Sequence, residues 1–241
     1  FWWDRRQDGI VACLLENQQA VSVLVTRRLM ERMNEYPLIV VAEWDSLEKD
    51  LCEQLVEYVK NGGRVLIVGA QTKALFQQTL DEAKPEDAPL AAGTVPDGMS
   101  CEFYALENGR IATIDQPITD AYRGDPNPAV RDFVGAVVRE LFPDPIVTVE
   151  GSRDVDVSVM RVKSGELAVH FVNTSGPHRT AGVIDSVEPT DAIDVSIATG
   201  AKPKQVALQP GNRAVDWNWK DGRVTLRIES VPIHEIVVVS E

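Results

Sequence analysis

The hydrophobic pattern of the chain changes near residue 146, from a helical period to strict alternation of apolar and polar residues. In the first part, Leu47, Leu51 and Leu55 recur every four residues, as in an amphipathic helix with one buried face. The continuous apolar runs LIVVA and RVLIVG lie on either side of this helix and are typical of buried parallel strands. The sequence therefore predicts a β-α-β unit with a right-handed crossover.

The other segments of the first part also alternate between strand-like and helix-like patterns. We expect strands over 20–26 and 110–115, helices over 27–36, 72–80 and 127–142, and a loop over 81–100. Asp45 or Ser46 is expected to cap the helix over 45–61, and Gly62 or Gly63 to end it in a left-handed conformation. Residues 1–145 are therefore predicted to form a three-layer α/β domain with a mainly parallel sheet, of the flavodoxin-like class.

The second part contains seven strand-like runs of about 7–10 residues, most of which end in Gly, Pro or Asp. The tetrapeptides KSGE and KDGR are typical of tight hairpins. Because no helical period interrupts these runs, residues 146–241 are predicted to form an antiparallel β-sandwich. The FPDP stretch at 142–145 is the expected hinge between two domains.

The charge balance excludes several classes of partner. The net charge of −13 and the pI near 4.7 argue against nucleic acid and against anionic membrane surfaces, which attract Lys and Arg. No apolar run approaches the roughly 20 residues of a membrane span. The chain begins FWWDRRQDG, without Met or a signal-peptide pattern, so we interpret it as a piece of a longer product whose compartment the sequence does not indicate.

Cysteine and histidine positions give no support for a metal centre or a disulfide framework. Three cysteines are an odd number, and they do not lie at zinc-ligand spacings from the three histidines. The loop over 115–125 holds Asp115, Asp120 and Asp125, but it lacks the EF-hand pattern, and a solvated acidic loop is favoured over a calcium site. We therefore expect no metal and no cofactor.

A nucleophile is missing where a related fold would place one. In the class I glutamine amidotransferase fold, a Cys or Ser lies at a sharp strand-to-helix turn, beside the backbone amides that form an oxyanion hole. The matching stretch is LIVGAQT, in which Val68, Gly69 and Ala70 have no nucleophilic group. Thr72 is the nearest hydroxyl, and a threonine in this position caps a helix more often than it catalyses. Cys52 is interpreted as a small core residue, and no catalytic residue is predicted.

Several of these stretches resemble a known family. YPLIVVAEWDSLEKDLCEQLVEYVKNGGRVLIVG and NGRIATIDQPITDAYRGDPNPAVRDFVGAVVRELFPDPIVTVEG resemble the amidotransferase-like, or trimerisation, domain of bacterial glycoside hydrolases of the β-galactosidase type. ELAVHFVNTSG resembles a strand of the β-sandwich that often ends such enzymes. The catalytic barrel of the family has no counterpart in this sequence. The resemblance therefore implies an accessory region whose partner is a catalytic barrel of the same parent chain or of a sister subunit.

Aromatic residues provide the candidate binding positions. Trp217 and Trp219 lie two residues apart and so face the same side of a strand, where two indoles could stack on a sugar ring. Packing in the core or against another protein is the more common role of such a pair. Candidate contacts to a barrel or a partner subunit are Trp2, Trp3, Tyr122 and Arg123.

Three functions are consistent with these observations. The leading interpretation is a non-catalytic accessory or oligomerisation region of a glycoside hydrolase, with homo-oligomerisation as one expected role. The first alternative is a carbohydrate-binding protein that uses Trp217 and Trp219. The second is an enzyme of the amidotransferase-like fold with an atypical nucleophile.

Overall fold

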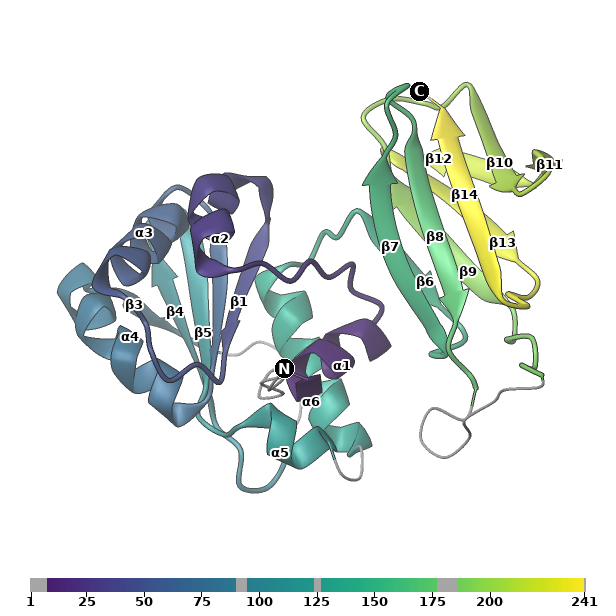
Figure 1. Cartoon of the computed structure of the whole chain (residues 1–241). Helices are drawn as coiled ribbons and strands as arrows, with labels where there is room; N and C mark the ends of the chain where they lie inside the picture. The colour runs from purple at the N-terminus through teal and green to yellow at the C-terminus, as the bar shows by residue number, and fades with distance from the viewer. Residues whose placement is uncertain (1–7, 90–94, 124–126, 177–185, 241) are drawn as a thin grey trace. The chain divides into compact units, whose positions relative to one another are not determined.

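The structure, a computed structural model, describes residues 8–89, 95–123, 127–176 and 186–240. The chain divides into two compact units (Figure 1). The first comprises Phe1–Leu14 and Ser22–Asp144, and the second comprises Leu15–Val21 and Pro145–Glu241. The expected division at residue 145 did not assign Leu15–Val21 to the second unit. This segment is tied to the rest of that unit by a hydrogen bond that the Gln18 side-chain amide donates to the Ser152 carbonyl (2.6 Å). No helix among the described residues is long and apolar enough to span a membrane.

The first unit contains a mixed five-stranded sheet. Its strands, in spatial order, are β1 (Leu38–Ala42), β2 (Arg64–Val68), β5 (Gly109–Ile114), β4 (Cys101–Leu106) and β3 (Glu86–Ala88). β1, β2 and β5 are parallel, whereas β4 and β3 are antiparallel to their neighbours. The expected mainly parallel sheet is therefore corrected to a mixed one. The physical reason is the two-residue turn at Glu107 and Asn108, which reverses the chain between β4 and β5.

Helices lie on both sides of this sheet (Figure 1). Their bounds are α1 (Asp8–Glu16), α2 (Thr26–Arg32), the 3-10 turn η1 (Met33–Glu35), α3 (Lys49–Lys60), α4 (Ala70–Ala83), α5 (Ile118–Arg123) and α6 (Pro128–Leu141). One core cluster joins α3 and α4 to the sheet: Leu55 and Phe76 pack with Val65, Ile67 and Ile111. Side chains alternate along a strand, so Leu66 and Val68 of β2, also fully buried, face the α6 side.

The ends of α3 and α6 test the helix caps that the sequence predicts. Gly62 follows α3 with φ +99°, as expected of a glycine that ends a helix in a left-handed conformation. The predicted N-cap of α3, Asp45 or Ser46, is wrong, because the helix begins at Lys49 and its N-cap is Glu48, which makes no side-chain capping bond. In α6, Asn127 accepts a hydrogen bond from the Ala129 amide (2.9 Å) and Pro128 occupies the first turn.

Three strand assignments before residue 146 differ from the sequence prediction. Residues 20–25 form no strand, and Val23 and Val25 are 78% and 71% exposed. A strand needs a hydrogen-bonding neighbour as well as an apolar composition, and these residues have none of the sheet pairings found in the described chain. β4 was not predicted, and β3 lies within the expected loop over 81–100, of which residues 90–94 are outside the described part of the chain.

The second unit is an antiparallel β-sandwich, as predicted. One sheet has the order β11-β10-β14-β8-β7 and the other the order β12-β13-β9-β6. The strand bounds are β6 (Val147–Glu150), β7 (Val155–Arg161), β8 (Leu167–Asn173), β9 (Ile193–Ala198), β10 (Gln205–Gln209), β11 (Arg213–Ala214), β12 (Trp217–Lys220), β13 (Arg223–Ile228) and β14 (His234–Ser240). The seven predicted runs all contain strands, while β6 and β11 are additional.

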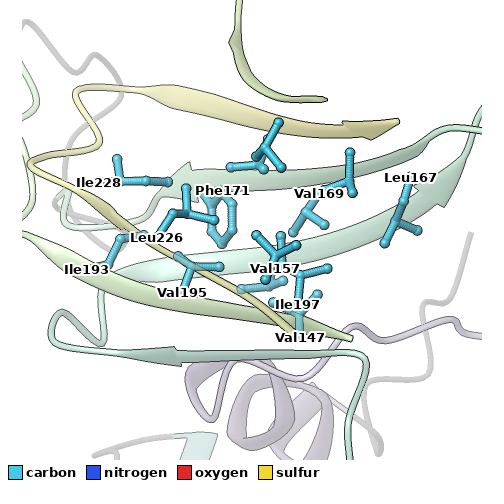
Figure 2. Close-up of a cluster of buried hydrophobic side chains, with 14 of the residues drawn as sticks. Val147, Val157, Leu167, Val169, Phe171, Ile193, Val195, Ile197, Leu226 and Ile228 are labelled. Carbon is cyan, nitrogen blue, oxygen red and sulfur yellow. The ribbon is translucent and has the colours of Figure 1, made fainter. Parts of the chain in front are cut away.

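The core of the sandwich comes from alternate residues of the facing sheets (Figure 2). Phe171 and Val169 of one sheet pack with Ile193, Val195 and Leu226 of the other, and all five are at most 6% exposed. The KDGR hairpin forms between β12 and β13. Asp221 and Gly222 both have positive φ (52° and 76°), as a two-residue type I′ turn requires.

Candidate functional site

The carboxyl ends of the three parallel strands form the candidate site, because ligands of α/β sheets bind outside this edge. Glu43 follows β1, Gly69 follows β2 and Asp115 follows β5. The amide of Glu43 donates to the Val68 carbonyl, and the amide of Gly69 to the Ile114 carbonyl, both at 2.8 Å. These bonds continue the strand pairing into the turns and place the three residues at one edge of the sheet.

The turn between β2 and α4 is the LIVGAQT stretch in which the sequence predicts no nucleophile. Gly69 is the N-cap of α4 and has φ +95°, a conformation that disfavours any other residue. Thr72 is fully buried and does not cap the helix. Its hydroxyl instead accepts from the Trp44 amide (2.8 Å) and donates to the Trp44 carbonyl (3.1 Å). The only hydroxyl of this turn is therefore engaged in fixing the loop after β1.

Glu43 connects the end of β1 to α5 and α1. It adopts a left-handed backbone with φ +50°, and its Oε1 accepts from the amides of Ile118 and Thr119, both at 2.8 Å. The Thr119 hydroxyl in turn accepts from the Gly9 amide (3.2 Å). A Cβ on Gly9 would lie 2.3 Å from the Thr119 Cα, so only glycine permits this approach of α1.

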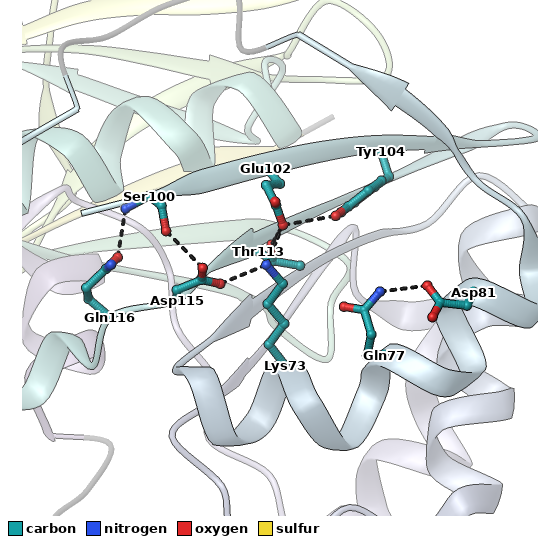
Figure 3. A network of polar contacts seen from close by, with 9 residues as sticks. All are labelled: Lys73, Gln77, Asp81, Ser100, Glu102, Tyr104, Thr113, Asp115 and Gln116. Carbon is teal, nitrogen blue, oxygen red and sulfur yellow. Dashed lines mark hydrogen bonds and ion pairs between the residues drawn. The ribbon is translucent and has the colours of Figure 1, made fainter. Parts of the chain in front are cut away.

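A network of charged and polar side chains surrounds Lys73 of α4 (Figure 3). Lys73 forms ion pairs with Glu102 of β4 and with Asp115, whose Oδ1 lies 2.8 Å from Nζ. Tyr104 donates its hydroxyl hydrogen to Glu102 Oε2 (3.0 Å), and the Ser100 hydroxyl donates to Asp115 Oδ2 (3.0 Å). One ammonium group therefore links a helix to two strands.

This geometry sets the protonation states of the network. Burial alone would lower the pKa of Lys73, but its bonds to Asp115 and Glu102 outweigh burial and raise that pKa. The bond from Lys73 is the main reason why the pKa of Glu102 is lowered. Burial would raise the pKa of Asp115, but the bonds from Lys73 and Ser100 outweigh burial and lower that pKa. The two carboxylates and the ammonium are thus all charged at neutral pH.

The thiol and phenol beside the network are held neutral. Burial, followed by the charge of Glu102, raises the pKa of Cys101 to about 12. Burial and the hydrogen bond to Glu102 raise the pKa of Tyr104 to about 12. A nucleophilic cysteine needs a lowered pKa, so Cys101 is a poor nucleophile at neutral pH. The described residues also contain no group of three or more His, Cys, Asp or Glu that could hold a metal ion.

The predicted sugar platform lies at an edge of the sandwich, where β12 is the outermost strand of its sheet. Trp217 and Trp219 share one face, as predicted, and both are partly buried against the sandwich core. The Trp219 indole N–H donates to the Thr199 hydroxyl (3.0 Å). The indole faces are thus engaged in part by apolar packing, and carbohydrate binding by these residues stays a prediction.

Of the four predicted interface residues, only Tyr122 has a side chain in the described part of the chain. Tyr122 belongs to α5 and is only 2% exposed, so its side chain packs inside the unit and has little surface for a partner. Arg123 is the last residue of the same helix, and its side chain is outside the described part. Trp2 and Trp3 also lie outside the described residues.

The sequence contained partial signals for this edge. Asp115 is one of the three aspartates of the predicted acidic loop, and in the structure its carboxylate pairs with the ammonium of Lys73. The side chain of Asp120 and the whole of Asp125 are outside the described part. Lys73 and Glu102 are 29 residues apart, and no spacing rule pairs them. Glu43, directly after the LIVVA run, could have been found as a polar residue at a strand's carboxyl end.

Solved structures with a fold similar to that of this chain are glycoside hydrolases, each matched over only part of its own length. No family model matches the sequence, and no curated protein matches it. An α-L-fucosidase, isoenzyme 2, from Paenibacillus thiaminolyticus is similar over 100% of this chain and 46% of its own, with a TM-score of 0.76 and 13% identity. A catalytic mutant of a GH42 β-galactosidase from G. stearothermophilus matches 98% of this chain and 36% of its own (TM-score 0.57, 12% identity).

A cold-adapted β-galactosidase from Rahnella sp. R3 is also similar, over 99% of this chain and 37% of its own, with a TM-score of 0.54 and 10% identity. At these identities the likeness concerns the fold. The chain spans less than half the length of each of these three structures.

Proposed function

We propose that this chain is the non-catalytic accessory region of a glycoside hydrolase. In this proposal, the first unit is an amidotransferase-like α/β domain, the second is the β-sandwich that follows it, and both support a catalytic barrel encoded elsewhere in a longer product. The observation that carries the proposal is the fold likeness that spans all of this chain but only 46% of an α-L-fucosidase.

The chemistry of the carboxyl edge supports a structural role. The turn that would hold a nucleophile contains Gly69 and Ala70, and Thr72 is occupied by the Trp44 backbone. The charged groups nearby are paired with one another, and the Cys101 thiol is protonated. An edge whose described residues offer no reactive group suits a domain that packs against a partner better than one that turns over a substrate.

The proposal is tested by identifying the native product and assaying it beside this chain. Mass spectrometry in the native host should find peptides that precede Phe1 in a product of roughly two to three times this mass, since comparable structures are that much longer. We expect the longer product, and not the 241-residue chain, to hydrolyse aryl fucosides or galactosides. A native product that begins close to Phe1, or glycosidase activity of this chain alone, would contradict the proposal.

Oligomerisation is the second part of the proposed role. Light scattering after size exclusion, over a range of protein concentrations, compares the mass of the longer product with that of a truncated variant that lacks residues 1–241. If the accessory region assembles the enzyme, the longer product is a homo-oligomer, with a trimer expected from the family resemblance. Removal of the region should then leave a monomer.

A further inference from the structure

We infer that His170 and His234 form a binding site for one divalent transition-metal ion, held by Nδ1 of His170 and Nε2 of His234. These two nitrogens lie 3.0 Å apart on neighbouring strands of the sandwich. Neutral imidazole is the commonest metal ligand in proteins and suits Zn²⁺, Cu²⁺ and Ni²⁺. The site lies within the second unit and does not depend on the accessory role proposed above.

The register of the sheet brings the two side chains together on its outer face. Phe171 of β8 and Val237 of β14 belong to the core of the sandwich. Because side chains alternate along a strand, His170 and His234 point to the opposite side, away from that core. His234 pairs with Val172 across the two strands, so it is the diagonal neighbour of His170. Long side chains in diagonal positions can reach each other.

The separation of the two nitrogens matches that of neighbouring ligands on a metal ion. With metal–nitrogen bonds of about 2.0–2.1 Å, two such ligands lie about 2.9 Å apart at a right angle and about 3.4 Å apart at the tetrahedral angle. The observed 3.0 Å falls within this range. The ring centroids are 5.2 Å apart, so the closest approach is made by the nitrogens rather than by the ring faces.

A hydrogen bond between two neutral rings uses the same two nitrogens. One facing nitrogen then bears the hydrogen and the other accepts it. A metal ion would take the place of this hydrogen, and the donor ring would carry its proton on its other nitrogen. Because each ring stays neutral, binding changes a tautomer and releases no proton from the pair. The hydrogen bond therefore holds the ligands close together without blocking the site.

The surrounding sheet fixes the ligands and leaves room for a cation. β8 and β14 are interior strands, flanked by β7 and β10, so both backbones are held before a metal binds. Ile236 and Val172, which pair with His170 and His234, carry no charge, and neither does Ser158 on β7. Two protein nitrogens fill only two coordination positions, so water completes the shell. We therefore expect weaker binding than at a site with three or four protein ligands.

Calorimetric titration of Zn²⁺ at pH 7.5, into protein first freed of metal with a chelator, tests the inference. We expect one zinc ion per wild-type chain. His170→Gln and His234→Gln should each bind zinc at least about tenfold more weakly, because each keeps one of the two ligands. His178→Gln is the matched control, since it removes the third histidine of the chain, and it should bind zinc as the wild type does.

Nuclear magnetic resonance of the imidazole nitrogens gives a readout that needs no variant. Zinc should shift the signals of His170 Nδ1 and His234 Nε2 and leave those of His178 unchanged. Zinc should also raise the thermal midpoint of the wild type and of His178→Gln, because it binds only the folded site, but not that of either other variant.

Three results would overturn the inference. Equal zinc binding by the wild type and all three variants would show that zinc binds elsewhere on the chain. A loss in only one of His170→Gln and His234→Gln would show a site with a single imidazole. No binding and no imidazole shift up to millimolar zinc would show that the pair forms a hydrogen bond alone.

Discussion

Lys73 Nζ lies 2.8 Å from Asp115 Oδ1 and also pairs with Glu102, so one helix residue bridges the ends of two neighbouring antiparallel strands. Lys73→Met would leave the two carboxylates without their cation. We expect the free energy of unfolding at pH 7 to fall by about 1 kcal/mol, because the carboxylates are a third to a half exposed and solvent screens the pairs. Urea denaturation measures this free energy. Lys49→Met, which removes the exposed ion pair between Lys49 and Glu53, is the control and should have little effect.

The same network predicts how stability depends on pH. The folded-state pKa values of Asp115 and Glu102 lie below the ordinary 3.8 and 4.5, so their stabilisation is complete above those values and is lost as the pH falls through the lowered ones. The Lys73 pKa is raised, so its contribution is present below 10.5 and is lost at more alkaline pH. The difference between wild type and Lys73→Met should therefore shrink below about pH 4; a constant difference would contradict the assignment.

Gly109→Ala should be strongly destabilising. An added Cβ would lie 2.1 Å from the Val59 carbonyl oxygen and 2.3 Å from that of Gly63, and neither backbone group can move without disturbing the end of α3. We expect a loss of about 3 kcal/mol or more in unfolding free energy. Gly165→Ala is the control, because it tests backbone strain without a steric clash. Gly165 has φ +95° but no neighbour within 4 Å, so the substitution should lower the unfolding free energy by only about 1 kcal/mol.

His170 and His234 predict a second pH effect, in the sandwich. Their Nδ1 and Nε2 atoms lie 3.0 Å apart, and burial, followed by the charge of His234, lowers the pKa of His170. A histidine with a lowered folded-state pKa stabilises the fold above the ordinary value of 6.5, and the contribution is lost as the pH falls through the lowered pKa. Thermal unfolding between pH 7.5 and 5 should show a smaller decrease for His170→Gln than for wild type. An equal decrease would contradict the prediction.

Trp217→Ala tests whether the two indoles serve the core or a ligand. Because Trp217 packs partly against the sandwich core, we expect a loss of about 2 kcal/mol in unfolding free energy. Asn218→Ala, on the opposite face of the same strand, should change it by less than about 0.5 kcal/mol. Indole fluorescence should stay constant when oligosaccharides are titrated. A saturable response that Trp217→Ala abolishes would instead favour the carbohydrate-binding alternative.

Thiol reactivity tests the alternative of an atypical enzyme. With a pKa of about 12, Cys101 is almost entirely protonated at pH 8, and burial also raises the pKa of Cys52. We expect every cysteine of the native protein to react with a maleimide or disulfide reagent more slowly than free cysteine. In urea all three should react at ordinary rates. One native thiol that reacts faster than free cysteine would reopen the enzyme hypothesis.

Local patterns in the sequence determined most elements of this protein. The four-residue spacing of leucines placed α3, the LIVVA and RVLIVG runs placed β1 and β2, and alternation placed the strands of the sandwich, because burial of one face imposes these periods directly. Gly62 and KDGR also acted locally, through the positive φ that each turn requires. The absence of a nucleophile between β2 and α4 could likewise be read from the sequence.

Tertiary structure alone decided the pairings. Residues 20–25 have the composition of a strand but form none, because a strand depends on a neighbour that a local pattern does not supply. The antiparallel half of the sheet depended on a hairpin that an apolar period does not reveal. The contacts of Lys73 with Glu102, and of Glu43 with α5, join residues 29 and 75 positions apart. Such distances are closed by packing of the whole domain, which is why the polar edge became visible only in the folded chain.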